Sequence, residues 1–510
     1  MSGIPVIDLF AGPGGLGEGF SSVQEPSGAA RFRIALSVEK DPAARRTLRL
    51  RAFFRQFPRG AVPGEYYDHL AGRLSESDLW AAHPRQAKDS DAEAWLAELG
   101  SRETPDEEID RRIVEGLGRA ARWVLIGGPP CQAYSLVGRS RVIGGEGLER
   151  YESDPRHGLY RHYLRILARH RPPVFVMENV KGLLSARIGN QRTFDRILSD
   201  LRDPARAMPC VASEPVRYRL HALAPVGLDL FGAAEPEDFV VRAERHGIPQ
   251  ARHRIIIVGI REDIGRRPGT LPELPSPSVA DVIDDLPPLR SGLSKQEDSP
   301  ESWAEAVRSI SDEPWFADGS VPKDVIGPVL KALRDLRSRP GRGAEFLECC
   351  PKPRMLSDWF CDPKLPGITN HSTRGHIIGD LHRYLFAAAF AVARDRSPLL
   401  EDFPQQLLPD HGNVAAALER TKFNDRFRVQ IRSRPSTTVV SHISKDGHYF
   451  IHPDPSQCRS LTVREAARLQ TFPDNYHFEG MRTDQYRQVG NAVPPLLARR
   501  IAEIVSGVLG

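Results

Sequence analysis

The chain has 510 residues, of which 40% are hydrophobic and 27% are charged, and its formal net charge is +4. Since a domain holds about 100–200 residues, this length predicts two or three domains. The composition excludes a disordered, collagen-like or coiled-coil protein, and no apolar run reaches the ~18 residues that a membrane span needs. The small net charge neither requires nor excludes a nucleic-acid partner.

The six cysteines stand at positions 131, 210, 349, 350, 361 and 458. This sparse, irregular spacing does not predict a disulfide framework and is typical of a protein from a reducing cytoplasm. The adjacent pair Cys349–Cys350 lacks the two-residue gap of zinc knuckles, so we expect no metal site. The N-terminus has no basic region before its apolar run, and we expect it to begin the fold with a strand rather than to direct export.

Short apolar runs alternate with helical patterns through the first half of the chain. This alternation predicts an α/β fold with a largely parallel sheet. A charged helical insertion is expected over 66–120. The expected strands are 4–10, 31–40, 123–130, 172–180 and two runs within 239–260, and a helix is expected over 157–170.

The pattern changes after about residue 285, where proline, serine and arginine become frequent. This stretch holds a strong helical pattern at 376–394 and ends in VSHISKDGHYFIHP, which predicts a hairpin around Asp446–Gly447. The segment 488–509 is helical again. We therefore divide the chain into a first domain over 1–289, a second, smaller domain over 290–475 and a C-terminal segment over 476–510.

A glycine-rich loop follows the first predicted strand. Gly12, Gly14 and Gly17 match G-x-G-x-x-G, and Glu39 closes the next strand. Such a loop lets the backbone approach a ligand, and an acid at the end of the second strand binds ribose hydroxyls. Dinucleotides and S-adenosylmethionine are both bound in this way. The alternative is a structural turn with a solvated carboxylate at the end of the strand.

A cysteine stands in the loop after a buried strand, in Gly127-Gly-Pro-Pro-Cys131-Gln-Ala-Tyr-Ser135. The carboxyl edge of an open α/β sheet is where ligands bind, and two prolines stiffen the approach to Cys131. These neighbours favour a nucleophile over the alternative, a buried structural cysteine. A positive or helix-N-terminal environment is needed to form the thiolate.

Two further motifs are predicted at the same edge. Glu178 follows the strand VFVM, where a buried carboxyl group can donate a proton. Arg252 and Arg254 alternate in QARHR, so we expect both guanidinium groups to face one pocket. Taken in isolation, these residues favour the alternatives: a strand-end carboxylate that caps the next helix for Glu178 and a solvated basic edge for the arginine pair.

Six motifs occur in a fixed order: DLFAGPGG, GGPPCQAYS, MENV, QARHR, LTVREAARLQTFP and QVGNAVPP. This set resembles the ordered motifs of DNA (cytosine-5)-methyltransferases and extends from residue 6 to about 498. The resemblance implies a Rossmann-like, S-adenosylmethionine-dependent methyltransferase domain with a smaller target-recognition domain. It also implies that the C-terminal segment packs beside the glycine loop, and that LTVREAARLQTFP organises the recognition domain without taking part in catalysis.

The resemblance also assigns the cofactor site. Phe10 would stack on the adenine of S-adenosyl-L-methionine, and Glu39 would hold its ribose hydroxyls. The same site would include Gly12, Gly14, Gly15, Pro130 and Asn491. This chain has Ala492 where the family often has serine. The insertion hides the acidic residue that would bind the adenine amine, so it stays unassigned.

The implied reaction begins with addition of the Cys131 thiolate to C6 of a cytosine that has been flipped out of double-stranded DNA. Glu178 would contact N3, Arg254 would neutralise O2 and Arg252 would steady the thiolate side. Gln132 and Ser135 are candidates for holding the flipped nucleotide; ordinary hydrogen bonds within the loop are the alternative.

The implied setting is the bacterial cytoplasm and a restriction-modification or other defence system, with the enzyme acting as a monomer on DNA without contact to a membrane. Three alternatives remain: a tRNA cytosine-5 methyltransferase of the same fold, a non-catalytic DNA-binding protein and, from the glycine loop alone, a nicotinamide oxidoreductase. The long second domain argues against the first. The presence of Cys131, Glu178 and Arg254 argues against the second, and the other motifs argue against the third.

Overall fold

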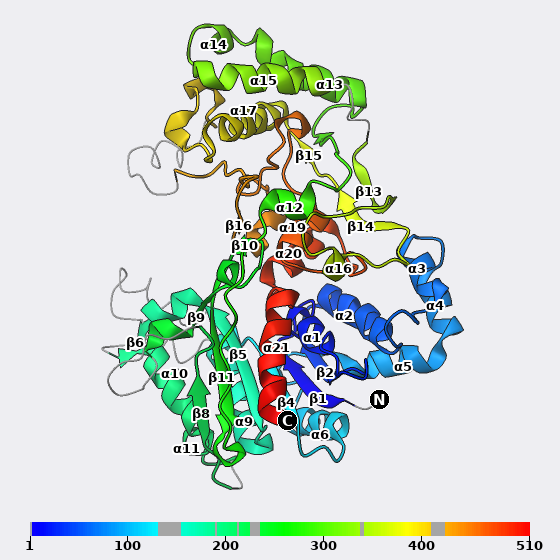
Figure 1. The fold of residues 1–510 in the computed structure, drawn as a ribbon, viewed down its shortest axis with the longest axis vertical. Coiled ribbons are helices and arrows are strands. Elements are labelled where there is room, and N and C mark those ends of the chain that lie inside the picture. Colours follow the sequence, from blue (N-terminus) through cyan, green and yellow to red (C-terminus); the bar gives the residue numbers. More distant parts are fainter. Residues whose placement is uncertain are drawn as a thin grey trace.

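The computed structural model describes residues 3–130, 155–188, 191–211, 214–224, 235–336, 341–409 and 424–510. The predicted site residues Cys131, Gln132 and Ser135 lie outside the described residues. Figure 1 shows two lobes along the long axis: a lower lobe (3–289 and 482–510) built on a sheet, and an upper lobe (290–460) that ends in helices. Residues 461–481 form a junction between them. In the part of the chain that is described, no helix has the length and apolar character to cross a bilayer.

The lower lobe is built on a mixed sheet that has eight strands among the described residues. Five neighbouring strands are parallel, and the next strand, β11, is antiparallel to β5, β8 and β9. Parallel strands are buried on both faces, which is why their sequences are continuously apolar. In spatial order the strands are β3 (Ala94–Leu96), β2 (Phe32–Glu39), β1 (Ile4–Leu9), β4 (Val124–Gly127), β5 (Val174–Val180), β11 (His253–Arg261) and β8 (Tyr218–His221), with β9 (Val240–Arg242) on β11.

Helices cover both faces of this sheet. One face carries α6 (Asp106–Leu117), α9 (Pro155–His170) and α10 (Thr193–Arg202), and the other carries α1 (Gly15–Ser21) and α21 (Pro495–Leu509). Helix α2 (Pro42–Arg55) follows β2. The Asp41 carboxylate caps this helix by accepting from the backbone N–H groups of Ala43 and Ala44, and Pro42 supplies a favourable first residue.

Helices α1 and α21 approach each other at backbone distance, although their sequences lie at opposite ends of the chain (Figure 1). A Cβ atom at Gly19 would lie 2.5 Å from the Pro495 carbonyl oxygen, and one at Gly15 would lie 2.2 Å from the Val493 carbonyl oxygen. Real Cβ atoms do not approach oxygen this closely, so glycine at both positions is a condition of the contact. The contact brings residues 491–493 beside the glycine loop.

The upper lobe has its own apolar core, which contains Trp303 and the faces of its helices. Helix α17 (Ile378–Arg394) is buried over most of its length, and its stretch 384–391 is continuously apolar. The helices of the upper lobe are α13 (Pro300–Arg308), α14 (Pro314–Ala317), α15 (Lys323–Asp335), α16 (Ser357–Phe360) and α17 (Ile378–Arg394). Its strands form an antiparallel pair, β13 (Gly343–Glu348) and β14 (Gly367–Ser372), and a parallel pair, β12 (Gly292–Leu293) and β15 (Gly375–His376).

The junction holds charged side chains that are buried and fully paired with one another or with backbone carbonyls. Arg459 donates to both oxygens of Glu465 at 2.6 and 2.7 Å. Arg464 donates to carbonyl oxygens, and Arg468 pairs with Asp474. Because buried guanidinium groups are tolerated only when they are hydrogen-bonded, removal of one partner would leave an uncompensated charge in the interior. The junction contains α19 (Val463–Leu469), and two helices of the lower lobe, α12 (Val279–Ile283) and α20 (Arg482–Asn491), pack against it.

Most of the predicted elements are confirmed, and two expectations are wrong. The 66–120 stretch is not entirely helical: besides α3 (Gly64–Leu70), α4 (Glu76–Ala82), α5 (Pro84–Glu93) and α6, it contains β3, which pairs with β2 at the edge of the sheet. The 440–453 stretch does not form a hairpin. Residues Ser441–Ser444 form a 3₁₀ helix against α20, because Gly490 lets the 440–441 backbone pack directly on it.

We predict that Gly19→Ala lowers the free energy of unfolding by about 1–3 kcal/mol, because the new methyl group overpacks the α1–α21 contact. The matched control is Gly507→Ala in α21, where a Cβ atom would meet nothing within 4 Å. The control should be neutral or more stable by up to about 1 kcal/mol, since alanine is the better helix former. Equal effects of the two changes in denaturant titrations would contradict the tight contact.

We also predict that acid destabilises the junction. Burial lowers the pKa of His371 and of His452 to about 4, well below the ordinary value for histidine. Below about pH 6.5 these two histidines therefore bind protons in the unfolded chain but stay neutral in the folded protein. The free energy of unfolding falls as the pH is lowered from 6.5 towards 4. Between pH 7 and pH 5 each histidine should cost about 2 kcal/mol of unfolding free energy. In denaturant titrations, His371→Gln should flatten this dependence, and an unchanged slope would show that His371 does not contribute.

Candidate active site

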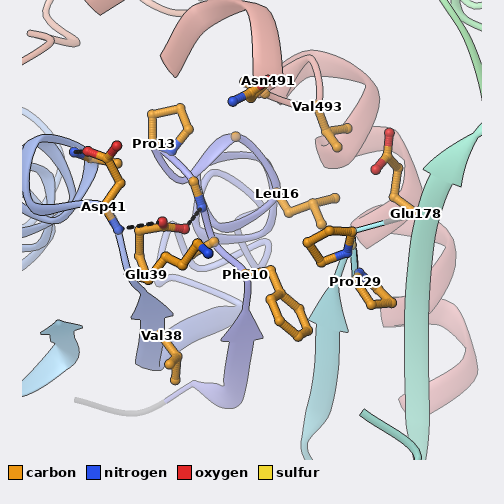
Figure 2. Close-up of a pocket in the computed structure, with 18 of the residues that line it drawn as sticks. Phe10, Pro13, Leu16, Val38, Glu39, Asp41, Pro129, Glu178, Asn491 and Val493 are labelled. Carbon is orange, nitrogen blue, oxygen red and sulfur yellow. Dashed lines mark hydrogen bonds between the residues drawn. The ribbon is translucent and has the colours of Figure 1, made fainter. Parts of the chain in front are cut away.

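Three parallel strands end at one edge of the sheet and bring their following loops together. In the register of the sheet, Leu9 at the end of β1 is the partner of Gly127 at the end of β4, and Gly127 is the partner of Met177 in β5. The loop after β1, the segment Gly128–Pro130 and Glu178 therefore lie side by side. Figure 2 shows Phe10, Pro129 and Glu178 around the same space.

The glycine loop is fixed to the end of β2. Gly12 has a positive φ of 56°, and its N–H donates to Oε2 of Glu39 at 2.8 Å. Oε1 of Glu39 accepts from the N–H of Asp41, also at 2.8 Å, and burial raises the pKa of the Glu39 carboxyl (Figure 2). A Cβ atom at Gly12 would meet nothing within 4 Å, so the loop leaves open space beside the carboxylate.

A cavity of about 380 Å³ lies between the glycine loop, the strand ends and the C-terminal segment. This volume is in the range of small-molecule and cofactor sites. One part of the wall is apolar, with Phe10, Val38 and Leu99, and another is polar, with Glu39 and Asn491. The predicted site residues that line the cavity are Phe10, Gly12, Gly15, Glu39, Pro130, Glu178 and Asn491. Gly14 lies behind it as the N-cap residue of α1.

An ion pair stands at the β5 side of the cavity. Nε of Arg254 lies 3.0 Å from Oε1 of Glu178, and both side chains are largely buried. The neighbouring Asn179 donates from Nδ2 to the carbonyl oxygen of Pro129 at 3.1 Å. This hydrogen bond fixes the backbone just before residue 131, so the carboxylate, the guanidinium group and the start of the cysteine loop are held in one place.

Arg252 does not share a pocket with Arg254, contrary to the expectation from their alternation. Its guanidinium group is buried and donates to the carbonyl oxygens of Val439 at 2.8 Å and Gly490 at 3.4 Å. Burial and the charge of Arg254 lower the pKa of Arg252 to about 9. Arg252 lies just before β11, in a tight turn in which its N–H donates to the carbonyl oxygen of Gln250 at 2.9 Å. From this turn its side chain extends into the junction.

Sequence reasoning missed the cavity wall that follows β3. Glu98 and Leu99 line the cavity, and Glu98 forms an ion pair with Lys40 at 2.9 Å. The relevant signal was the short run AWLAEL, which is strand-like but is set among helical patterns. Its pairing with β2 is a long-range contact that periodicity alone does not reveal.

Comparison with known protein families identifies one family model. The model of C-5 cytosine-specific DNA methylases matches residues 101–204 and 372–506. The first range includes Cys131 and Glu178, and the second includes Asn491. Arg252 and Arg254 lie between the two matched ranges.

Curated relatives resemble the chain over most or all of its length. The type II methyltransferase M.Bpa9945I of Bacillus paralicheniformis is 31% identical over 99% of both chains. The DNA (cytosine-5-)-methyltransferase M.ApeKI of Aeropyrum pernix is 27% identical over 77% of this chain and 83% of its own. Among solved structures, an E. coli prophage protein described as a DNA modification methyltransferase has a TM-score of 0.51 at 18% identity, covering 99% of both chains. That structure supports the shared fold.

Proposed function

The chain belongs to the C-5 cytosine-specific DNA methylase family, and we propose from this premise how its residues perform the reaction. It is a DNA (cytosine-5-)-methyltransferase of a family that uses S-adenosyl-L-methionine. The observation that carries the assignment of residues is the Glu178–Arg254 ion pair beside Pro130, at the edge of the cavity.

The residues around the cavity fit S-adenosyl-L-methionine. Phe10 and Leu99 offer apolar surface for an adenine ring, and the buried Glu39 carboxylate is the group expected beside ribose hydroxyls. Glu98 would supply an acid for the adenine amine, and Asn491 would add a polar contact to the cofactor. When bound, this cofactor supplies an electrophilic methyl group on a sulfonium.

The chain's own residues would activate the cytosine. The Cys131 thiolate adds to C6 of the flipped base, which breaks the aromaticity and makes C5 nucleophilic. Negative charge then develops towards N3 and O2. Glu178 protonates or hydrogen-bonds N3, and Arg254, released in part from Glu178, neutralises O2. After C5 has gained the methyl group, loss of the C5 proton and expulsion of the thiolate restore the ring. In this proposal Arg252 positions the junction and has no direct contact with the base.

We propose double-stranded DNA as the substrate, a monomer as the acting species and Gln132 and Ser135 as contacts to the flipped nucleotide. Residues 1–289 would form the catalytic domain, 290–475 the target-recognition domain and 476–510 a segment that completes the catalytic domain. The separate apolar core of the upper lobe supports this division. The type II names of the bacterial relatives support a role in a restriction-modification system in the cytoplasm.

We predict that Cys131→Ser reduces methyl transfer to DNA by more than about 10³-fold, because the serine hydroxyl is a far weaker nucleophile. DNA binding, measured by gel shift, should persist. Substantial turnover by this variant would refute Cys131 as the nucleophile.

We predict that Glu178→Gln lowers kcat by about 10²-fold or more, because the amide cannot donate a proton to N3. Affinity for S-adenosylhomocysteine, measured by calorimetry, should change little. Glu503→Gln is the matched control, since it removes one acid from an exposed ion pair on α21. Loss of cofactor affinity in Glu178→Gln with kcat preserved would assign Glu178 to the cofactor site instead.

A further inference from the structure

The helical insertion of the lower lobe touches the upper lobe through a small apolar cluster. Leu365 and Phe346 of the upper lobe pack with Val62, Tyr66 and Tyr67, which lie in or just before α3. Figure 1 shows α3 at the level of β13, β14 and α16, on the side of the molecule where the two lobes meet. The insertion therefore reaches across the boundary between the lobes.

Hydrogen bonds at this contact converge on one carboxylate. The Tyr67 hydroxyl donates to Oδ2 of Asp362 at 2.7 Å, and Nδ2 of Asn475 donates to the same oxygen at 2.7 Å. Nζ of Lys364 donates to the carbonyl oxygen of Val62 at 3.0 Å. Hydrogen bonds to an ionised acceptor are about twice as strong as neutral ones, so Asp362 is the strongest point of this contact. We call Tyr67, Asp362 and Asn475 the interlobe clamp.

The clamp is continuous with the glycine loop. Oδ1 of Asn475 accepts from Arg51 at 3.0 Å, and Arg51 is paired at 2.5 Å with Glu18 of α1. The next residue, Tyr476, is buried and its hydroxyl donates to the carbonyl oxygen of Pro13. The upper lobe, the insertion and the glycine loop are thus linked through two consecutive residues of the junction, Asn475 and Tyr476.

The site needs such a restraint. In the proposed reaction, a flipped base must reach groups of the lower lobe while the rest of the DNA is held against the upper lobe. A small error in the relative position of the lobes would therefore slow methyl transfer. Other contacts between the lobes lie in the junction and in the pairing of β10 (Gln250–Ala251) with β16 (Ser436–Thr437). The clamp is the part built from the insertion.

We propose that the insertion positions the upper lobe. Tyr67 of the insertion and Asp362 of the upper lobe are the positioning residues, and they hold the upper lobe at a fixed place above the cofactor cavity. The inference rests on the proposed function only for its kinetic readout. Neither residue touches the cavity, so neither is a catalytic residue.

The experiment compares Tyr67→Phe with Tyr218→Phe. Both changes delete one buried tyrosine hydroxyl, and the Tyr218 hydroxyl donates to the Pro172 carbonyl oxygen at 2.9 Å, inside the lower lobe. Tyr67→Phe should raise KM for DNA by about three- to tenfold, as expected for loss of a hydrogen bond to a charged group. Affinity for S-adenosylhomocysteine should stay within about twofold of the wild type. Tyr218→Phe should lower the thermal stability about as much as Tyr67→Phe does, but it should leave KM for DNA unchanged.

A second pair of variants tests the acceptor. Asp362→Asn keeps an oxygen that can accept the Tyr67 hydroxyl and should raise KM less than Asp362→Ala. The double variant Tyr67→Phe/Asp362→Ala should be no worse than Asp362→Ala alone, because both changes break the same contact. Equal KM values for wild type and Tyr67→Phe, or fully additive effects in the double variant, would overturn the proposal.

Hydrogen–deuterium exchange separates this proposal from the proposed function, because it needs no turnover. Backbone amides of residues 361–372 should exchange faster in Tyr67→Phe than in the wild type or in Tyr218→Phe. Unchanged exchange there would overturn the clamp even in an active enzyme. Faster exchange in a protein whose wild type transfers no methyl group would support the clamp and contradict the function.

Discussion

The contact between α1 and the C-terminal segment is the constraint on which the cavity depends. The glycine loop supplies one wall and residues 487–493 supply another, so the cavity exists only when the two ends of the chain meet. The Val493 carbonyl oxygen occupies the space that a Cβ atom at Gly15 would need, and the Pro495 carbonyl oxygen does the same at Gly19. Gly15 and Gly19 are not the glycines that match G-x-G-x-x-G, so the glycine-rich segment after β1 holds a second set of glycines that permits helix docking.

Most polar residues of the sequence motifs hold backbone segments together, and few of them face the cavity. Gln250 donates to the carbonyl oxygen of Leu469, Gln470 donates to that of Val489, and Arg252 donates to those of Val439 and Gly490. Three motifs far apart in sequence are thereby joined at one place. Burial of these polar groups is tolerated only because each has hydrogen-bond acceptors. Loss of an acceptor would leave a polar group unpaired in the interior. In the proposed reaction, the chemistry is carried out by Cys131, Glu178 and Arg254.

The sequence allowed prediction of four of the five parallel strands, because short apolar runs stand out between the helical patterns. It also placed Phe10, Glu39 and Glu178 at strand ends, and the sheet brings these strand ends to one edge. It did not reveal β3, whose three residues are identified only by pairing with β2, nor the 3₁₀ helix at Ser441–Ser444, which packs on Gly490. The orientation of Arg252 was equally inaccessible, since a turn of the backbone beside β11 overrides simple alternation. In each case the deciding contact is distant in sequence.

The proposed mechanism requires Cys131 to form a covalent bond to C6 of a flipped cytosine. The decisive measurement mixes the enzyme and S-adenosyl-L-methionine with duplex DNA that carries 5-fluorocytosine at a site that the enzyme methylates. Fluorine at C5 cannot leave as a proton does, so the thiolate cannot be expelled and the adduct persists. We expect a denaturation-resistant protein–DNA complex in which mass spectrometry locates the nucleotide on Cys131. Methylation of ordinary DNA without such a complex, or attachment at another residue, would contradict this mechanism.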